Sequence, residues 1–331
     1  MATLFSPLHV GQVTIRNRIV MPPMGINLAD AQGAVSEAHI EHYARRAATG
    51  IGMIIVEHSY VRPDGKYSEG QLGIYDDALI PGLRRLAQAI KAGGSLAGIQ
   101  ITHGGGRCRS AITGSQPLAA SDGLIAGGSE PARALDTLEI EAIVEAFAAA
   151  ARRAILAGFD FVEVHGAHGY LLSEFVSPLT NRRRDQYGGS LQNRLRLSLE
   201  VLAAVRPVIG PDRLLLYRLG ADDLLPGGLT QAEGCQAGRL LAEAGVDILD
   251  VSGGLGGSEP PDWDGVSQGY FVPLAAAVRA AARVPVIGVG GIRDAQVADQ
   301  IVRSGQADLI AVGRALLNNP NWAAEARTTL G

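Results

Sequence analysis

The chain has 331 residues, of which 47% are hydrophobic and 19% charged, so it can bury a sizeable core and is not expected to be disordered. Its formal net charge of -4 is not the positive charge typical of proteins that bind nucleic acid or an anionic membrane surface. Two cysteines are too few for a disulfide framework or an iron–sulfur cluster. With no signal-peptide pattern and no apolar run of about 18 residues, we expect a cytoplasmic protein with small-molecule partners.

Eight short runs rich in β-branched and aliphatic residues alternate with amphipathic segments, which is the pattern of parallel β-α-β units. The predicted strands are 18–21, 52–57, 97–102, 159–165, 214–219, 246–251, 286–289 and 309–312. The predicted helical stretches include 36–49, 81–92, 138–156, 192–208, 231–244 and 295–303. No Pro/Gly/Ser-rich linker divides the chain, so we predict one α/β domain over 1–331, a closed (β/α)8 TIM barrel.

Two predicted connections are too long for plain links, which usually have about 4–6 residues. They are residues 103–137 after the third strand and 252–271 after the sixth. Since barrel active sites lie at the carboxyl ends of the strands, we expect both loops to wall a pocket there. Segment 4–15, whose apolar residues are split by a Val-Gly-Gln turn, predicts a hairpin that plugs the opposite end.

Glycines follow the last two strands of the predicted barrel. Gly290 and Gly291 come after the seventh strand, and Gly313 and Arg314 after the eighth. Loops at these places often bind phosphate in barrels, because glycine lets backbone amides approach the anion, and a guanidinium can grip it with two hydrogen bonds. The alternative is that the glycines only make tight turns. A dinucleotide fingerprint is excluded because Arg293 stands where its third glycine would be needed.

The stretch VHGAHGY, residues 164–170, ends the fourth predicted strand. Alternation along that strand points His165 into the mouth of the barrel. Glycines on either side of His168 permit a turn that brings His168 and Tyr170 to the same mouth. Two imidazole donors aimed at one ligand oxygen, with a phenol nearby as proton donor, suit acid-catalysed chemistry.

Other interpretations of these histidines stay open. They could be core histidines with satisfied hydrogen bonds, or metal ligands together with Glu163 and His103, although no HxH or HExxH spacing supports a metal and we predict none. Polar groups also end other strands, namely Gln100 and Arg218. A buried arginine needs a ligand that accepts its hydrogen bonds, or an ion pair with Glu163 or Asp250. Together the groups describe a phosphate anchor and a planar polar ligand across the mouth.

The sequence resembles the Old Yellow Enzyme family, which comprises FMN-dependent ene-reductases and NAD(P)H:flavin oxidoreductases built on a (β/α)8 barrel. The resemblance runs from LFSPL (4–8) and RNRIVMPPM (16–24) to Gly313 and Arg314. It is most specific over HGAHGY (165–170), LSEF (172–175), YGGS (187–190) and NR (193–194). It implies an NADPH dehydrogenase or enoate reductase that uses FMN and NAD(P)H to reduce the C=C bond of α,β-unsaturated carbonyl or nitro compounds.

The resemblance also implies roles for individual residues. Those expected to bind FMN are Pro22, Pro23, Met24 and Gly25 along the flavin, His58 near the ring, Gln100 and Arg218 at the pyrimidine edge, and Gly290, Gly291, Gly313 and Arg314 at the phosphate. His165 and His168 would bond the substrate oxygen, Asn27 and Tyr270 would face the substrate, and Tyr170 would protonate the α-carbon after hydride reaches the β-carbon. NAD(P)H would use the same face first, which implies ping-pong kinetics.

Three features depart from the family pattern. Gly25 stands where relatives carry cysteine or threonine, His58 where they have a small residue, and Asn27 where some have a substrate-facing tyrosine. The physiological substrate, stereochemistry, choice of NADH or NADPH and any homo-oligomer are not predicted. Competing hypotheses are a flavin-free barrel enzyme acting on phosphosugars, a binding protein without turnover, and flavin-dependent dehydrogenase or demethylase chemistry.

Overall fold

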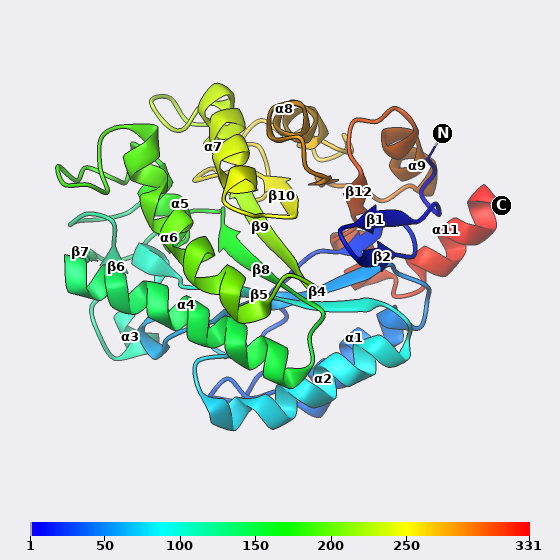
Figure 1. The fold of residues 1–331 in the computed structure, drawn as a ribbon, viewed down its shortest axis with the longest axis horizontal. Helices are drawn as coiled ribbons and strands as arrows, with labels where there is room; N and C mark the ends of the chain where they lie inside the picture. The colour runs from blue at the N-terminus through cyan, green and yellow to red at the C-terminus, as the bar shows by residue number, and fades with distance from the viewer. Residues whose placement is uncertain (1) are drawn as a thin grey trace.

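Eight parallel strands close into a barrel at the centre of the computed structural model, which describes residues 2–331 (Figure 1). Each strand pairs with the next along the chain, and the last pairs with the first. The strands are β3 (Ile19–Met21), β4 (Met53–Tyr60), β5 (Leu96–Thr102), β8 (Phe161–Gly166), β9 (Leu214–Gly220), β10 (Ile248–Ser252), β11 (Val286–Gly288) and β12 (Leu309–Ala311). The predicted (β/α)8 barrel is therefore confirmed.

One strand end differs from the prediction in a way that concerns the site. Strand β4 runs to Tyr60 instead of residue 57, and its register against β5 shifts between Val56 and Ser59. His58 therefore lies within β4, at this irregularity, and not after the strand. Bulges of this kind re-aim side chains next to active sites, and alternation alone cannot reveal them.

Helices surround the barrel (Figure 1). The longer ones are α1 (Glu37–Ala47), α2 (Ile80–Ala92), α4 (Thr137–Ala157), α6 (Leu191–Ile209), α7 (Gln231–Glu243), α8 (Val272–Ala282), α9 (Ala295–Arg303) and α11 (Trp322–Leu330). Helix α4 shows why the sequence specifies its ends: Asp136 accepts a hydrogen bond from the Glu139 amide in a capping box, and Gly158 ends the helix with φ of 92°. The alanine-rich α8 was not among the predicted stretches, although its buried residues Val272, Ala275, Val278 and Ala282 recur at helical spacing.

The barrel interior is filled by apolar side chains that point inward from the strands. Val20, Met53, Phe161 and Leu216 belong to this cluster. The predicted hairpin forms as β1 (Leu8–Val10) and β2 (Val13–Ile15), and its apolar residues pack against the same interior cluster. The hairpin therefore plugs the amino-terminal end of the barrel, as predicted, and leaves the carboxyl ends of the strands for a site.

The two long loops differ in where they lie. The loop after β10 contributes to the cavity described below, as expected. The loop after β5, which contains α3 (Ser110–Thr113), β6 (Leu118–Ala119) and β7 (Arg133–Ala134), contributes no residue to its lining. It packs instead on the segment after α5 (Leu171–Val176), where Arg183 donates hydrogen bonds to the carbonyls of Ala120 and Leu135 at 3.1 and 2.7 Å.

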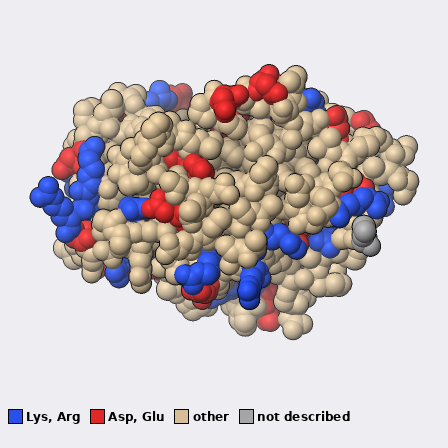
Figure 2. Space-filling view, turned by 90° about the horizontal axis from the view of Figure 1, so that it is seen from above, with Lys and Arg blue, Asp and Glu red and all other residues tan. Residues whose placement is uncertain are grey.

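The surface carries charges of both signs. Figure 2 shows acidic and basic side chains scattered over one face, with broad uncharged areas between them. Among residues 2–331, no helix is long and apolar enough to cross a membrane.

Candidate active site

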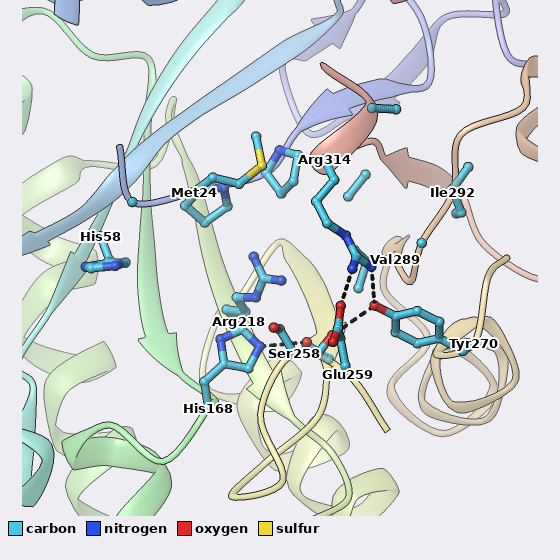
Figure 3. A pocket seen from close by; sticks show the side chains of 18 of the residues that line it. Met24, His58, His168, Arg218, Ser258, Glu259, Tyr270, Val289, Ile292 and Arg314 are labelled. Carbon is cyan, nitrogen blue, oxygen red and sulfur yellow. Dashed lines mark hydrogen bonds and ion pairs between the residues drawn. The ribbon is translucent and has the colours of Figure 1, made fainter. Parts of the chain in front are cut away.

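A cavity of about 500 Å³ opens at the carboxyl ends of the barrel strands (Figure 3). Its volume is in the range of small-molecule sites, about 300–1,000 Å³. The predicted site residues that line it are Pro22, Pro23, Met24, Gly25, His58, His165, His168, Tyr170, Arg218, Tyr270, Gly291, Gly313 and Arg314. Asn27, Gln100 and Gly290 are predicted site residues that do not line it.

His165 is the penultimate residue of strand β8, and its side chain lines the cavity. Its Nδ1 accepts a hydrogen bond from the Ala167 amide at 3.3 Å, so the ring proton lies on Nε2. Within residues 2–331, Nε2 has no hydrogen-bond partner. Burial holds the pKa of His165 well below its usual range, with nearby cations adding to the effect. His165 is therefore a neutral donor facing the cavity.

His168 sits between the glycines of the turn and has a φ of 60°, which is uncommon outside glycine. Its amide donates to the carbonyl of Gly253 at 3.3 Å, and its Nε2 lies 2.8 Å from Ser252 Oγ at the end of β10. Burial, followed by the charge of Arg218, lowers the pKa of His168 well below its usual range. Ser252 was missed in the sequence; its only signal is a hydroxyl at the end of a buried strand.

The glycine at position 166 is required by packing. A Cβ there would lie 2.0 Å from Tyr217 Oη, a distance that no side chain tolerates. The turn can follow β8 closely only because this position is bare.

Tyr170 precedes α5, and its ring packs against three other rings, two of which line the cavity. The ring centroids lie 4.9 Å from His165, 5.6 Å from His58 and 5.3 Å from Tyr67. Burial raises the pKa of the Tyr170 phenol above its usual range. The phenol therefore stays protonated at neutral pH, and its hydroxyl has no partner within residues 2–331.

Arg218 is the buried cation of the site, pointing inward from β9. Its Nη1 lies 3.2 Å from Asp250 Oδ2, so the ion pair considered from the sequence is present. Its Nε is nevertheless buried without an acceptor among residues 2–331. A buried N–H without an acceptor is costly, so the position suits a ligand oxygen or ring nitrogen.

Gln100, on β5, does not line the cavity and is already engaged. Its Nε2 donates to Glu163 Oε1 on the neighbouring strand β8 at 2.8 Å. Burial raises the pKa of Glu163, and the nearby Asp250 carboxylate raises it further. The predicted contact of Gln100 with the flavin stays a prediction.

The other end of the cavity carries the predicted phosphate site. Gly290 and Gly291 have φ values of 129° and 62°, and a Cβ on Gly290 would lie 2.7 Å from Tyr270 Cδ2. Arg314 lies beside this turn, 4.8 Å from the centroid of the Trp263 ring, and its Nη2 donates to Tyr270 Oη at 3.0 Å. The structure thus places Tyr270 with Arg314, and its predicted contact with the substrate stays a prediction.

Arg314 also pairs with the carboxylate of Glu259 (Figure 3). Glu259 belongs to the long loop after β10, and both side chains are about half exposed, 50% and 46%. Its carboxylate stands where an anionic ligand group would meet the guanidinium. The sequence offered no signal for this pair, because the two residues are far apart along the chain.

The remaining predicted residue, Asn27, lies just outside the cavity lining. It has a φ of 53°, and its Oδ1 accepts from the Ser68 hydroxyl at 2.7 Å. Its predicted contact with the substrate stays a prediction.

The segment that lines the cavity at residues 22–25 is held by a buried acid. Glu57 Oε2 accepts from the Ile26 amide at 3.1 Å, and Oε1 lies 2.9 Å from His39 Nε2. The Glu57 amide donates to Tyr43 Oη at 2.9 Å. This positioning network was not recognised in the sequence, where Glu57 was only the end of a strand.

The cavity fits a flavin mononucleotide in three respects. The glycine turn and Arg314 form a cradle for a phosphate, Arg218 Nε offers a buried donor without an acceptor, and the lining between them is partly apolar. Among residues 2–331, no group of three or more His, Cys, Asp or Glu side chains could hold a metal ion.

Comparison with known proteins agrees with this geometry. Residues 3–330 match the NADH:flavin oxidoreductase / NADH oxidase family. The chain is 43% identical over 329 residues to the NADH oxidase of Thermoanaerobacter brockii, covering 98% of this chain and 50% of that protein. It is 41% identical to the NADPH dehydrogenase of Geobacillus sp. (strain WCH70), covering 99% and 94%.

Solved structures show the same relationship. An Old Yellow Enzyme homologue from Zymomonas mobilis superposes with a TM-score of 0.87 at 29% identity, covering 99% of this chain and 93% of that chain. A 2-naphthoyl-CoA reductase superposes at 0.93 and 28% identity, and the chain spans 52% of its length. The chain therefore belongs to the NADH:flavin oxidoreductase / NADH oxidase family, and it is an NAD(P)H-dependent flavin oxidoreductase with FMN as its cofactor.

Proposed function

We propose that this oxidoreductase reduces the C=C bond of α,β-unsaturated carbonyl or nitro compounds. The observation that carries the proposal is the convergence of His165, His168 and Tyr170 on one buried wall of the cavity. Because the chain belongs to a flavin oxidoreductase family, the hypothesis of a flavin-free barrel enzyme that acts on phosphosugars is excluded. Dehydrogenase or demethylase chemistry on the same barrel stays an alternative prediction.

The residues that would hold FMN are the glycine turn at 290–291, Gly313 and Arg314 at the phosphate, and Arg218 at the ring. When bound, FMN supplies hydride transfer from NAD(P)H to the alkene. The cationic Arg218 stabilises negative charge on a ligand that lies against it.

The two histidines then act on the substrate oxygen. His165 carries its proton on Nε2. In the proposed arrangement the Ser252 hydroxyl, 2.8 Å from His168 Nε2, is the donor of that hydrogen bond, which leaves the His168 proton on Nδ1. Both imidazoles donate to the carbonyl or nitro oxygen and so draw electron density from the β-carbon. Because both are neutral, they polarise the double bond without protonating the oxygen.

Tyr170 completes the reaction. Its Oη gives a proton to the α-carbon as the β-carbon receives hydride. Two new C–H bonds thus replace the π bond of the alkene. The raised pKa keeps this proton available at neutral pH. The tyrosinate is reprotonated from solvent.

The test is the Tyr170→Phe variant of the FMN-loaded protein in anaerobic stopped flow. Reduction by NADPH should change less than about threefold, whereas reoxidation by 2-cyclohexenone should slow by about a hundredfold, the usual range for a lost general acid. Tyr67→Phe, which removes a neighbouring phenol whose ring lies 5.3 Å from that of Tyr170, is the matched control. Equal alkene rates in wild type and Tyr170→Phe would overturn the assignment.

A further inference from the structure

The wall of the cavity beside Gly25 is formed by His58, a residue that the proposed chemistry does not use. A Cβ added to Gly25 would lie 3.0 Å from His58 Nε2 and 3.6 Å from Cε1. Gly25 does not have a left-handed φ, so its backbone would accept a side chain. A side chain at position 25 would therefore point at the imidazole of His58 and crowd it, so that the ring would have to move by a few tenths of an ångström.

Gln71 fixes the tautomer of His58. The Gln71 Oε1 accepts from the Tyr67 amide at 2.7 Å, and Nε2 donates to the His58 carbonyl at 3.0 Å, so two main-chain groups orient the amide. The same Nε2 lies 2.8 Å from His58 Nδ1. Since that amide nitrogen is a donor, Nδ1 must accept, and the ring proton of His58 lies on Nε2.

The Nε2–H of His58 faces the cavity next to Gly25 and has no acceptor within residues 2–331. Burial lowers the pKa of His58, although the Glu57 carboxylate opposes this effect. Protonation of Nδ1 would also require the loss of the Gln71 hydrogen bond. His58 is thus a neutral donor whose direction is fixed by its neighbours.

We propose that His58 Nε2–H donates a hydrogen bond to the isoalloxazine ring of bound FMN, and that β4 thereby supplies the polar contact that position 25 cannot make. The proposal rests on the FMN site of the proposed function. A reduced flavin ring carries more negative charge than an oxidised one, so a donor stabilises the reduced form more. His58 should therefore raise the two-electron midpoint potential of the bound flavin.

The experiment measures the midpoint potential and visible spectrum of the FMN-loaded protein, neither of which requires turnover. His58→Leu removes the donor and should shift the oxidation–reduction equilibrium about tenfold toward the oxidised form, which is about 30 mV for a two-electron couple. His58→Gln places an amide N–H at a similar reach and should restore at least half of the shift. A His58→Leu protein with wild-type potential and spectrum would overturn the proposal.

A double-mutant cycle tests the contact with Gly25. Gly25→Ala should shift the potential in the wild-type background, because its methyl group displaces Nε2, and should have no effect in His58→Ala. Equal effects in both backgrounds would also overturn the proposal. If the potential shifts as expected but no activated alkene is reduced, the inference stands and the proposed substrate class fails; a protein that takes up no FMN overturns both.

Discussion

The two ends of the cavity are built on different principles. At the histidine end, His165 and Tyr170 are 2% and 8% exposed, and their partners come from packed strands and turns. At the phosphate end, Arg314 and Glu259 are about half exposed and hold each other across two loops. The histidine end is preorganised by burial, whereas the end at Arg314 is held by charges that water screens and that a ligand can replace.

The largest expected effect on stability concerns the buried ion pair of Arg218 and Asp250. Arg218→Met leaves the buried carboxylate of Asp250 without its cation, and removing one partner of a buried pair typically costs about 3–5 kcal/mol. We expect the free energy of unfolding to fall by about 3 kcal/mol in urea denaturation. Arg239→Met, which breaks the exposed pair with Glu243, should cost less than about 0.5 kcal/mol. Equal losses in the two variants would contradict the contrast between buried and exposed charges.

The next effect concerns the substrate donors. His165→Ala removes one preorganised N–H, which is worth about 3 kcal/mol or about a hundredfold in rate. Alkene reduction under single-turnover conditions should slow by that factor, while the protein keeps its FMN. A change smaller than about threefold would show that His165 does not touch the reacting oxygen.

A third test changes pH. The pKa values of His165 and His168 are lowered by burial, whereas an unfolded histidine titrates near about 6.5. Below that pH the unfolded chain binds more protons than the folded one, so these groups remove stability as the solution is acidified. Between pH 7.5 and 5.5, wild type should therefore lose more unfolding free energy than His168→Asn. The His9→Asn variant, which changes an exposed histidine, should lose as much unfolding free energy as wild type over this pH range. An equal loss in wild type and His168→Asn would contradict the burial argument.

The smallest effect is expected at the phosphate end. Glu259→Gln removes the carboxylate that competes for Arg314, and an exposed pair of this kind is worth less than about 1 kcal/mol. FMN should bind the apoprotein more tightly by up to about fivefold in a fluorescence titration. Weaker binding would mean that Glu259 supports the phosphate site instead of competing with the ligand.

The sequence correctly predicted features that are encoded by residues close together along the chain. Strand periodicity predicted the barrel, and the glycines around His168 predicted the turn that brings it to His165 and Tyr170. Contacts between distant segments were not predicted: Ser252 with His168, Glu57 with the Ile26 amide, and Glu259 with Arg314. No periodicity encodes such pairs, because they depend on how loops from different strands meet.

The placement of loop residues was least predictable. Tyr270 lies beside Arg314, and the side chain of Asn27 accepts a hydrogen bond from Ser68. His58 lies in an irregular part of β4, where a register shift decides which way its side chain points. Family resemblance identified Asn27 and His58 as unusual, but only the packing around Gly25 led to the proposed role of His58.

The most direct test of the two-ended cavity is a crystal structure of the FMN-loaded protein with a bound phenolic or enone ligand. We expect the phosphate to lie against Gly291, Gly313 and Arg314, with Glu259 displaced. The ligand oxygen should lie within about 3.2 Å of ring nitrogens of His165 and His168. A flavin bound in the opposite direction, or a ligand oxygen out of direct reach of both imidazoles, would contradict this arrangement.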